Sequence, residues 1–176
     1  MNTKNNKRRQ ETIKKIETIF LEYLQQKEIS QIKVSDICKK AEINRSTFYA
    51  NFTDVYDLAD KIRLSLEDEV NKMLKTDVDW QNCENDFLKL FEHIMKNQRL
   101  YYFYFKLGYD NCYDLKLFNA YESGYDINKE FVDYHIEFFK NGFNSIVKKW
   151  LYGGCKDTPE QMRDILLFEY RGRFEK

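Results

Sequence analysis

The chain has 176 residues, of which 43% are hydrophobic and 33% charged, and its formal net charge is zero. This balance is typical of a folded domain rather than a disordered chain, and the length suffices for one core or for a small module joined to a larger one. One proline and six glycines are too few turn residues for an all-β sandwich. We therefore expect an all-α fold.

Membrane and secretory segments are not expected. No stretch approaches the ~20 consecutive apolar residues of a membrane span, and residues 1–10 are polar and basic, without the apolar core of a signal peptide. The sequence thus predicts a cytoplasmic protein with no membrane partner. The cysteines are too far apart for a metal knuckle or a disulfide framework, so we expect reduced thiols at Cys38, Cys83, Cys112 and Cys155.

The sequence also lacks the common signatures of enzymes. There is no glycine-rich phosphate loop, no nucleophile elbow and no HExxH motif. The two histidines, His93 and His135, stand singly, which predicts no metal site. We therefore expect neither an enzyme nor a bound cofactor.

Charge is unevenly distributed along the chain. Residues 1–63 contain 13 Lys and Arg against 9 Asp and Glu, net +4, whereas the remaining 113 contain 16 against 20, net −4. A basic front end on an acidic body is typical of a phosphate-facing module attached to a second domain. A charge difference of this size between two parts of a chain can also arise by chance.

The first half of the chain shows helical periodicity. Apolar residues at spacings of three and four predict an amphipathic helix over about residues 10–27. Two short helices follow, Val34–Lys40 and Arg45–Asn51, and the turn of about four residues between them requires a steep crossing. An apolar line of about twenty residues from Asp54 predicts a connecting helix, followed by a polar loop over Lys75–Asn85.

Helices are predicted in the second half too. A stripe over residues 87–95 and the aromatic run at 101–105 are helical patterns, and we expect a short helix around residues 113–121. A long pattern runs from Ile127 to Leu151 and ends at Gly153 and Gly154. A capping box, with the Thr158 hydroxyl and Gln161 three residues later, predicts the start of the last helix at Pro159.

The segment 33–58 carries the functional signal. Val34, Ile37, Ala41, Ile43 and Phe48 are spaced to close two short helices on each other and on the first helix, with the small Cys38 at the crossing. A tri-helical helix-turn-helix buries such a set and leaves one polar face, here Arg45, Ser46, Tyr49 and Asn51, to enter a major groove. The alternative is a purely structural helical hairpin.

These residues resemble the TetR/AcrR family of bacterial regulators. The family's N-terminal signature is matched by Val34, Asp36, Ile37, Ala41, Thr47, Phe48, Tyr49 and Phe52. The resemblance covers about residues 10–62. A softer resemblance, to one helical dimerisation variety of that family, lies in F-x-x-x-G-F-x-x-I-V-x-x-W-L at 138–151 and T-P-E-Q-M at 158–162.

The resemblance implies a set of DNA contacts. Arg45, Ser46 and Thr47 would form the first turn of the recognition helix and face bases or phosphates. Tyr49 would contact the phosphate backbone or a thymine methyl group. Backbone phosphates would be held by residues flanking that helix. The full set of expected DNA-binding residues is Ser35, Lys39, Arg45, Ser46, Thr47, Tyr49, Asn51 and Thr53.

Three residues depart from the family pattern. Lys33 stands where a capping threonine is common, Glu42 where a turn glycine is common, and Val55 where a phosphate-binding lysine is common. Glu42 must adopt an unusual backbone or a rearranged turn, at a cost of ~1–2 kcal/mol. Val55 removes one phosphate contact, which should lower the salt dependence of DNA binding.

The C-terminal part is expected to form a helical-bundle dimerisation and effector domain. We expect a helix-turn-helix domain at 1–55, with a basic arm at 1–9 that reaches a minor groove or frays, and the second domain at 56–176. The predicted dimer interface, whose alternative is an intramolecular core, comprises Phe139, Gly142, Phe143, Ile146, Val147, Trp150, Met162, Ile165 and Leu166. The aromatic run packs in the core or lines an effector pocket through Tyr101, Tyr102, Tyr104 and Phe105.

The combined hypothesis is a homodimeric regulator that binds double-stranded DNA. A small-molecule or protein effector in the body would change the distance between the two recognition helices. Repression is the family's common outcome. The alternative is a protein-interaction adaptor whose helix-turn-helix does not bind DNA alone, or a stand-alone small-molecule sensor or carrier.

Overall fold

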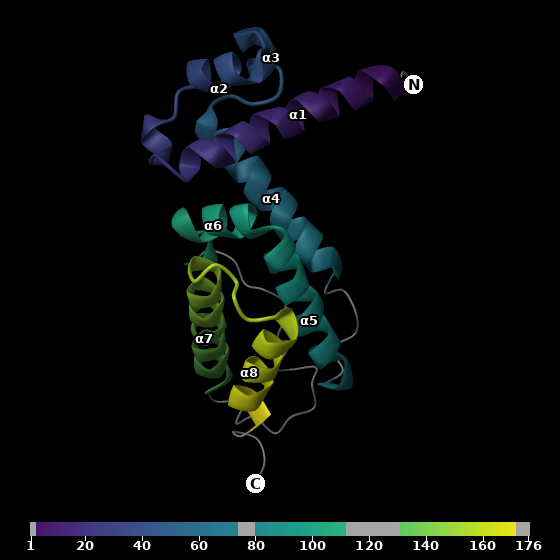
Figure 1. Cartoon of the computed structure of the whole chain (residues 1–176), viewed down its shortest axis with the longest axis vertical. Helices are drawn as coiled ribbons and strands as arrows, with labels where there is room; N and C mark the ends of the chain where they lie inside the picture. Colours follow the sequence, from purple (N-terminus) through teal and green to yellow (C-terminus); the bar gives the residue numbers. More distant parts are fainter. Residues whose placement is uncertain (1–2, 74–79, 112–130, 172–176) are drawn as a thin grey trace. The chain divides into compact units, whose positions relative to one another are not determined.

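The computed structural model describes residues 3–73, 80–111 and 131–171, and all regular structure in these ranges is helical, as predicted (Figure 1). In chain order the elements, with η for 3₁₀ helices, are α1 (Thr3–Leu24), η1 (Ile29–Gln31), α2 (Val34–Ala41), α3 (Arg45–Tyr49), α4 (Val55–Met73), α5 (Trp80–Lys96), α6 (Gln98–Lys106), η2 (Tyr109–Asn111), α7 (Val132–Tyr152) and α8 (Pro159–Arg171). Among the described helices, none is long and apolar enough to span a membrane.

The chain divides into two compact units, Met1–Leu66 and Glu67–Lys176. The division lies inside α4, about eleven residues after the boundary predicted between residues 55 and 56 at the start of that helix. Lys61 illustrates why the first turns of α4 belong to the first unit. Its Nζ donates to the backbone oxygen of Asn51 at 2.8 Å and lies 5.2 Å from the centre of the Phe52 ring.

The first unit is built on the contacts of α1 with α2 and of α2 with α3. Ile37, Ala41 and Phe48 are buried as predicted, and Val34 and Ile43 are half-buried. Its buried apolar side chains are Ile16, Ile19, Phe20, Leu24, Ile32, Ile37, Cys38, Ala41, Phe48, Phe52, Val55, Leu58, Ala59, Ile62 and Leu66. Burial raises the pKa of the Cys38 thiol, and the nearby Arg45 lowers it to a smaller extent.

Helix α1 begins earlier than the sequence pattern indicated. It starts at Thr3 and ends at Leu24, so residues 3–9 continue the helix instead of forming a separate basic arm. These residues carry no apolar side chain, and the periodicity that marks an amphipathic helix is therefore absent from them. Their Lys and Arg residues nevertheless extend a helix that already exists at low cost, because they lose little side-chain freedom in it, and these residues outnumber the less favourable Asn5 and Asn6.

The turn between α2 and α3 confirms the expectation for Glu42. This residue ends α2 with φ 55° and ψ 44°, in the left-handed region, and the amide of Ile43 donates to the carbonyl of Cys38 at 3.0 Å. A residue with a Cβ atom adopts this conformation at a cost of ~1–2 kcal/mol. Glu42 thus closes the turn in the way a glycine would, but with strain.

The second unit is held together by aromatic side chains. Helix α5 contacts α8, and Phe87 and Phe91 of α5 meet Phe139, Phe143 and Trp150 of α7 at ring-centroid distances between 5.6 and 6.4 Å. Figure 1 shows α7 and α8 running in opposite directions.

Helix α5 starts at Trp80, so the predicted loop over 75–85 was wrong from residue 80 onward. The helix predicted near residues 113–121 and the side chain of His135 lie outside the described residues.

The start of α8 confirms the predicted capping box. The amide of Thr158 donates to Gln161 Oε1 at 2.8 Å, and the amide of Gln161 donates to Thr158 Oγ1 at 3.3 Å. Pro159 is the first helical residue, where its missing N–H costs nothing. Before it, Gly154 adopts a φ of 82°, which only glycine tolerates without strain.

Replacing Thr158 by alanine should destabilise the protein by ~1 kcal/mol, because the amide of Gln161 loses its acceptor. The measurement is urea denaturation followed by circular dichroism. Lys156→Ala, an exposed change just before the cap, is the matched control and should leave the midpoint unchanged. Equal midpoints for the two variants would show that the box contributes nothing.

Replacing Glu42 by glycine should stabilise the protein by ~0.5–1 kcal/mol, because relief of the left-handed strain exceeds the added freedom of the unfolded chain. The change also removes the exposed ion pair of Glu42 with Lys15, 3.5 Å apart, which contributes little. Glu42→Gln removes only the ion pair and retains the strain, so it separates the two effects. A loss of stability in Glu42→Gly would contradict the assignment of strain.

Candidate nucleic-acid interface

Helix α3 presents different chemistry on its two sides. Phe48 is fully buried and its ring lies 5.5 Å from that of Phe52. Arg45, Ser46 and Tyr49 are exposed, Tyr49 at 56% of its surface. A single buried ring therefore holds the helix, and the predicted polar face is open to solvent.

The cations of the first unit fall into two groups. Lys40 pairs with Glu22 at 2.8 Å, a hydrogen bond that raises the pKa of Lys40, and Lys61 pairs with Asp57 at 2.9 Å. In the described part of the chain no carboxylate pairs with Arg8, Arg9, Lys39 or Arg45. Positive charge near α3 is therefore available to an external anion.

The remaining predicted phosphate contacts differ in accessibility. Lys39 is exposed, Ser35 and Thr47 are half-buried, and Thr53 is exposed with its backbone N–H donated to Asp57 Oδ2 at 2.8 Å. The hydrogen bond from Lys61, followed by that from the Thr53 amide, lowers the pKa of Asp57. Val55, at the position where the family commonly has lysine, is buried.

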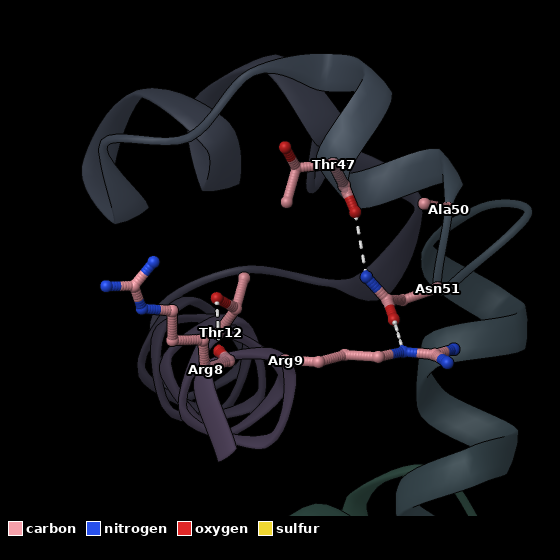
Figure 2. Close-up of a pocket in the computed structure, with 6 residues that line it drawn as sticks. All are labelled: Arg8, Arg9, Thr12, Thr47, Ala50 and Asn51. Atoms are coloured by element: carbon pink, nitrogen blue, oxygen red, sulfur yellow. Dashed lines mark hydrogen bonds between the residues drawn. The ribbon is translucent and has the colours of Figure 1, made fainter. Parts of the chain in front are cut away.

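Asn51 does not lie on the free face where the sequence analysis placed it. Its side chain is half-buried, Oδ1 accepts a hydrogen bond from Arg9 Nε at 2.8 Å, and Nδ2 donates to the Thr47 carbonyl at 2.8 Å (Figure 2). Both ends of the amide are thus engaged inside the first unit.

A hollow of about 410 Å³ opens where α1 meets the end of α3, lined by Arg8, Arg9, Thr12, Thr47, Ala50 and Asn51 (Figure 2). Sequence reasoning assigned Arg8 and Arg9 only to a terminal arm and did not connect them with α3. The link between Arg9 and Asn51 joins residues 42 positions apart, so no local pattern could have indicated it.

The predicted dimer interface needs correction. Six of its residues face the interior of the second unit and are at most 6% exposed, namely Phe139, Phe143, Val147, Trp150, Met162 and Leu166. They pack against α5 and other parts of their own unit, as the alternative of an intramolecular core predicted, because helix α5 covers the stripe. Ile165 is exposed, and Gly142 and Ile146 are half-buried.

A different set of apolar side chains is exposed on the second unit. Tyr134 and Phe168 are 75% and 79% exposed. Apart from Met95 and Tyr152, the exposed large apolar side chains described in this unit are Phe131, Tyr134, Phe138, Ile165 and Phe168, which we call the aromatic patch. Phe131 immediately precedes α7, Tyr134 and Phe138 lie in its first two turns, and Ile165 and Phe168 lie in the middle and second half of α8. Figure 1 draws the start of α7 and the end of α8 toward the same end of the unit. Only Ile165 was among the residues predicted for the dimer interface. Phe131, Tyr134 and Phe138 belong to the helical pattern predicted from Ile127 to Leu151, but periodicity alone does not show which apolar face of a helix stays exposed.

The aromatic run on α6 packs inside the second unit. Tyr101, Tyr104 and Phe105 are buried and Tyr102 is half-buried. The Tyr101 hydroxyl lies 2.8 Å from His93 Nδ1, and burial raises the pKa of Tyr101. These contacts favour core packing of the run over a pocket lining. The described residues contain no group of three or more potential ligands that could hold a metal ion.

The comparisons with known proteins agree with this architecture. Residues 81–168, half of the chain, match a TetR family model described as "Transcriptional regulator C-terminal region". A stretch of 90 residues is 31% identical to the HTH-type dhaKLM operon transcriptional activator DhaS of Lactococcus lactis subsp. lactis (strain IL1403) and covers 51% of this chain. The match spans 46% of that protein's length.

Two solved structures share the fold. A TetR transcriptional regulator from Streptococcus agalactiae 2603V superposes with a TM-score of 0.68 at 22% identity, over 96% of this chain and 98% of that one. A dihydroxyacetone kinase operon activator DhaS superposes with a TM-score of 0.61 at 19% identity, over 93% and 96% of the two chains. With the match over residues 81–168, these findings show that the chain belongs to the TetR family of transcriptional regulators.

Proposed function

We propose that the protein is a homodimeric regulator that binds duplex DNA through the exposed face of α3. The observation that carries the proposal is the division of this helix between a buried Phe48 and the exposed Arg45, Ser46 and Tyr49. A short polar helix held by one buried ring suits insertion into the major groove, which is wide enough to admit a helix.

Each exposed side chain of α3 has a role suited to its chemistry. Arg45 presents a guanidinium without a carboxylate partner in the described residues, and such a group binds the O6 and N7 atoms of guanine or a phosphate. The Tyr49 hydroxyl can donate to a phosphate, and its ring can contact a thymine methyl group. Lys39, on the helix before, supplies a further phosphate contact.

Homodimerisation through the aromatic patch is the second part of the proposal. Soluble monomers rarely expose large contiguous apolar surfaces, and the patch places Phe131 just before α7, two aromatic side chains of α7 and two apolar side chains of α8 in solvent. A twofold contact buries the same surface on both subunits. Two recognition helices then reach two half-sites about one helical turn of DNA apart.

Whether the protein represses or activates transcription is a question separate from how it binds DNA. The family resemblance predicts repression, whereas two proteins to which this chain is similar are named operon activators. Binding through α3 serves either outcome. A reporter fused to the promoter upstream of the protein's own gene should gain expression when a repressor is deleted and lose it when an activator is deleted.

Arg45→Ala and Tyr49→Ala should each weaken binding to the DNA upstream of the protein's own gene by about tenfold or more, because each removes a groove or phosphate contact. Gel-shift titration at fixed salt measures the affinity. Lys156→Ala, which removes an exposed cation of the second unit, is the control and should bind as the wild type does.

We call the exposed side of α3, formed by Arg45, Ser46 and Tyr49, its reading face. Unchanged affinity in both variants would refute the assignment of this face to DNA binding. Each variant should elute as the wild type does in size-exclusion chromatography and melt at the same temperature, because both side chains are exposed. These two measurements separate a lost contact from a lost fold.

A double substitution, Phe138→Glu with Phe168→Glu, should convert the dimer to a 21.5 kDa monomer, because four carboxylates would meet in the twofold interface. Analytical ultracentrifugation measures the mass. Met95→Glu alters an exposed apolar residue of α5, outside the patch, and should leave the mass unchanged. A wild-type protein that sediments as a monomer at micromolar concentration would refute the dimer.

A further inference from the structure

We infer that the hollow between α1 and the end of α3 is a phosphate site, in which Asn51 orients Arg9 toward a phosphate of the DNA backbone. The inference rests on the proposed function for the source of the phosphate, since it takes duplex DNA as the partner. It adds a second contact surface beyond α3 and gives Asn51 a positioning role in place of a direct contact with a base.

The contact between Arg9 and Asn51 fixes a charged group without neutralising it. Arg9 uses only Nε to donate to the amide oxygen of Asn51, at 2.8 Å. Its two Nη atoms have no acceptor in the described part of the chain, and Asn51 carries no charge. The guanidinium therefore keeps its full positive charge and the part of its donor set that suits a bidentate phosphate contact.

Asn51 is itself held from two sides. Its Nδ2 donates to the Thr47 carbonyl at 2.8 Å, and its backbone oxygen accepts a hydrogen bond from Lys61 Nζ at 2.8 Å. Each amide atom already makes one bond within the protein, which fixes the orientation of the side chain and leaves a base only the second hydrogen of Nδ2 and the second lone pair of Oδ1. A role through Arg9 leaves these bonds intact.

The opposite side of the hollow supplies further donors. Figure 2 shows the side chain of Arg8 on the other side of the opening from Asn51, and Arg8 also has no carboxylate partner among the described residues. The Thr47 side chain lies on the α3 wall. Thr12 donates its hydroxyl to the Arg8 carbonyl at 2.9 Å and so offers only acceptor capacity. No carboxylate lines the hollow, which leaves two positive charges around it.

The position of the hollow favours a backbone phosphate over a free anion. Thr47, Ala50 and Asn51 line it from the segment that begins as α3, whose other side chains form the proposed reading face. A helix lying in a major groove has phosphates along both of its edges. The hollow would therefore receive a phosphate whenever α3 enters the groove.

The test compares Arg8→Ala, Arg9→Ala, Asn51→Ala and the double variant Arg9→Ala with Asn51→Ala in the full-length protein. The probe is a random-sequence duplex of about 30 base pairs, long enough for two half-sites, and fluorescence anisotropy gives the affinity over a series of salt concentrations. Lys14→Ala removes an exposed cation of the same helix outside the hollow and serves as the matched control. Thermal melting by circular dichroism verifies that every variant folds.

Because the dimer carries two copies of each side chain, each arginine variant should lower the slope of log K against log salt by about 1.8, or about 0.9 per subunit, which corresponds to a loss of about sixtyfold at 0.1 M relative to 1 M salt. Asn51→Ala should weaken binding about threefold in the wild type and not at all in Arg9→Ala, because its role runs through Arg9. Asn51→Asp should lower the slope as Arg9→Ala does, since a carboxylate would neutralise Arg9.

The outcomes separate this inference from the proposed function. If the wild type binds DNA and the arginine variants behave as Lys14→Ala does, the phosphate site is refuted and the reading face of α3 stands. If the wild type does not bind duplex DNA at low salt, the proposed function fails. Inorganic phosphate that then shifts the Arg9 Nε–H signal in NMR spectra would identify a site for free phosphate and overturn DNA as its source. No shift would overturn the site altogether.

Discussion

The burial of Phe48 is the interaction on which the candidate interface depends. A helix of five residues is unstable alone, because nucleation fixes several backbone angles for a single hydrogen bond. Complete burial of one phenylalanine side chain contributes about 1.5–3 kcal/mol relative to exposure, enough to hold a segment this short. Since Phe48 points inward, Arg45 and Tyr49 are presented to solvent, and the reading face is as stable as the core beneath it.

Local signals were sufficient for several features of the fold. The Thr158 capping box depends on residues within one helical turn, and the strain at Glu42 follows from a side chain at a turn position that requires a left-handed backbone. The starts of α1 and α5 were missed for the opposite reason. The first turn of α1 is polar and that of α5 lacks a clear apolar period, and both are helical because they extend a segment whose later residues are buried.

The candidate sites were less predictable because they depend on tertiary contacts. Periodicity identified the stripe that contains Phe143 and Trp150 as buried, but it cannot tell whether a helix of the same chain or of a second copy covers it. The exposed face of α3 was predictable from its spacing against Phe48. The bond between Arg9 and Asn51 was not, because it joins two segments that only the packing of the first unit brings together.

The buried thiol of Cys38 determines how the first unit responds to oxidants. Peroxides and disulfides react with the thiolate, and burial both restricts their access and, by raising the pKa, keeps the group protonated at neutral pH. Both effects lower the reactivity of this thiol while the unit is folded. We expect oxidation of Cys38 to require at least local unfolding of the first unit, which would also disturb the packing of α2 against α3.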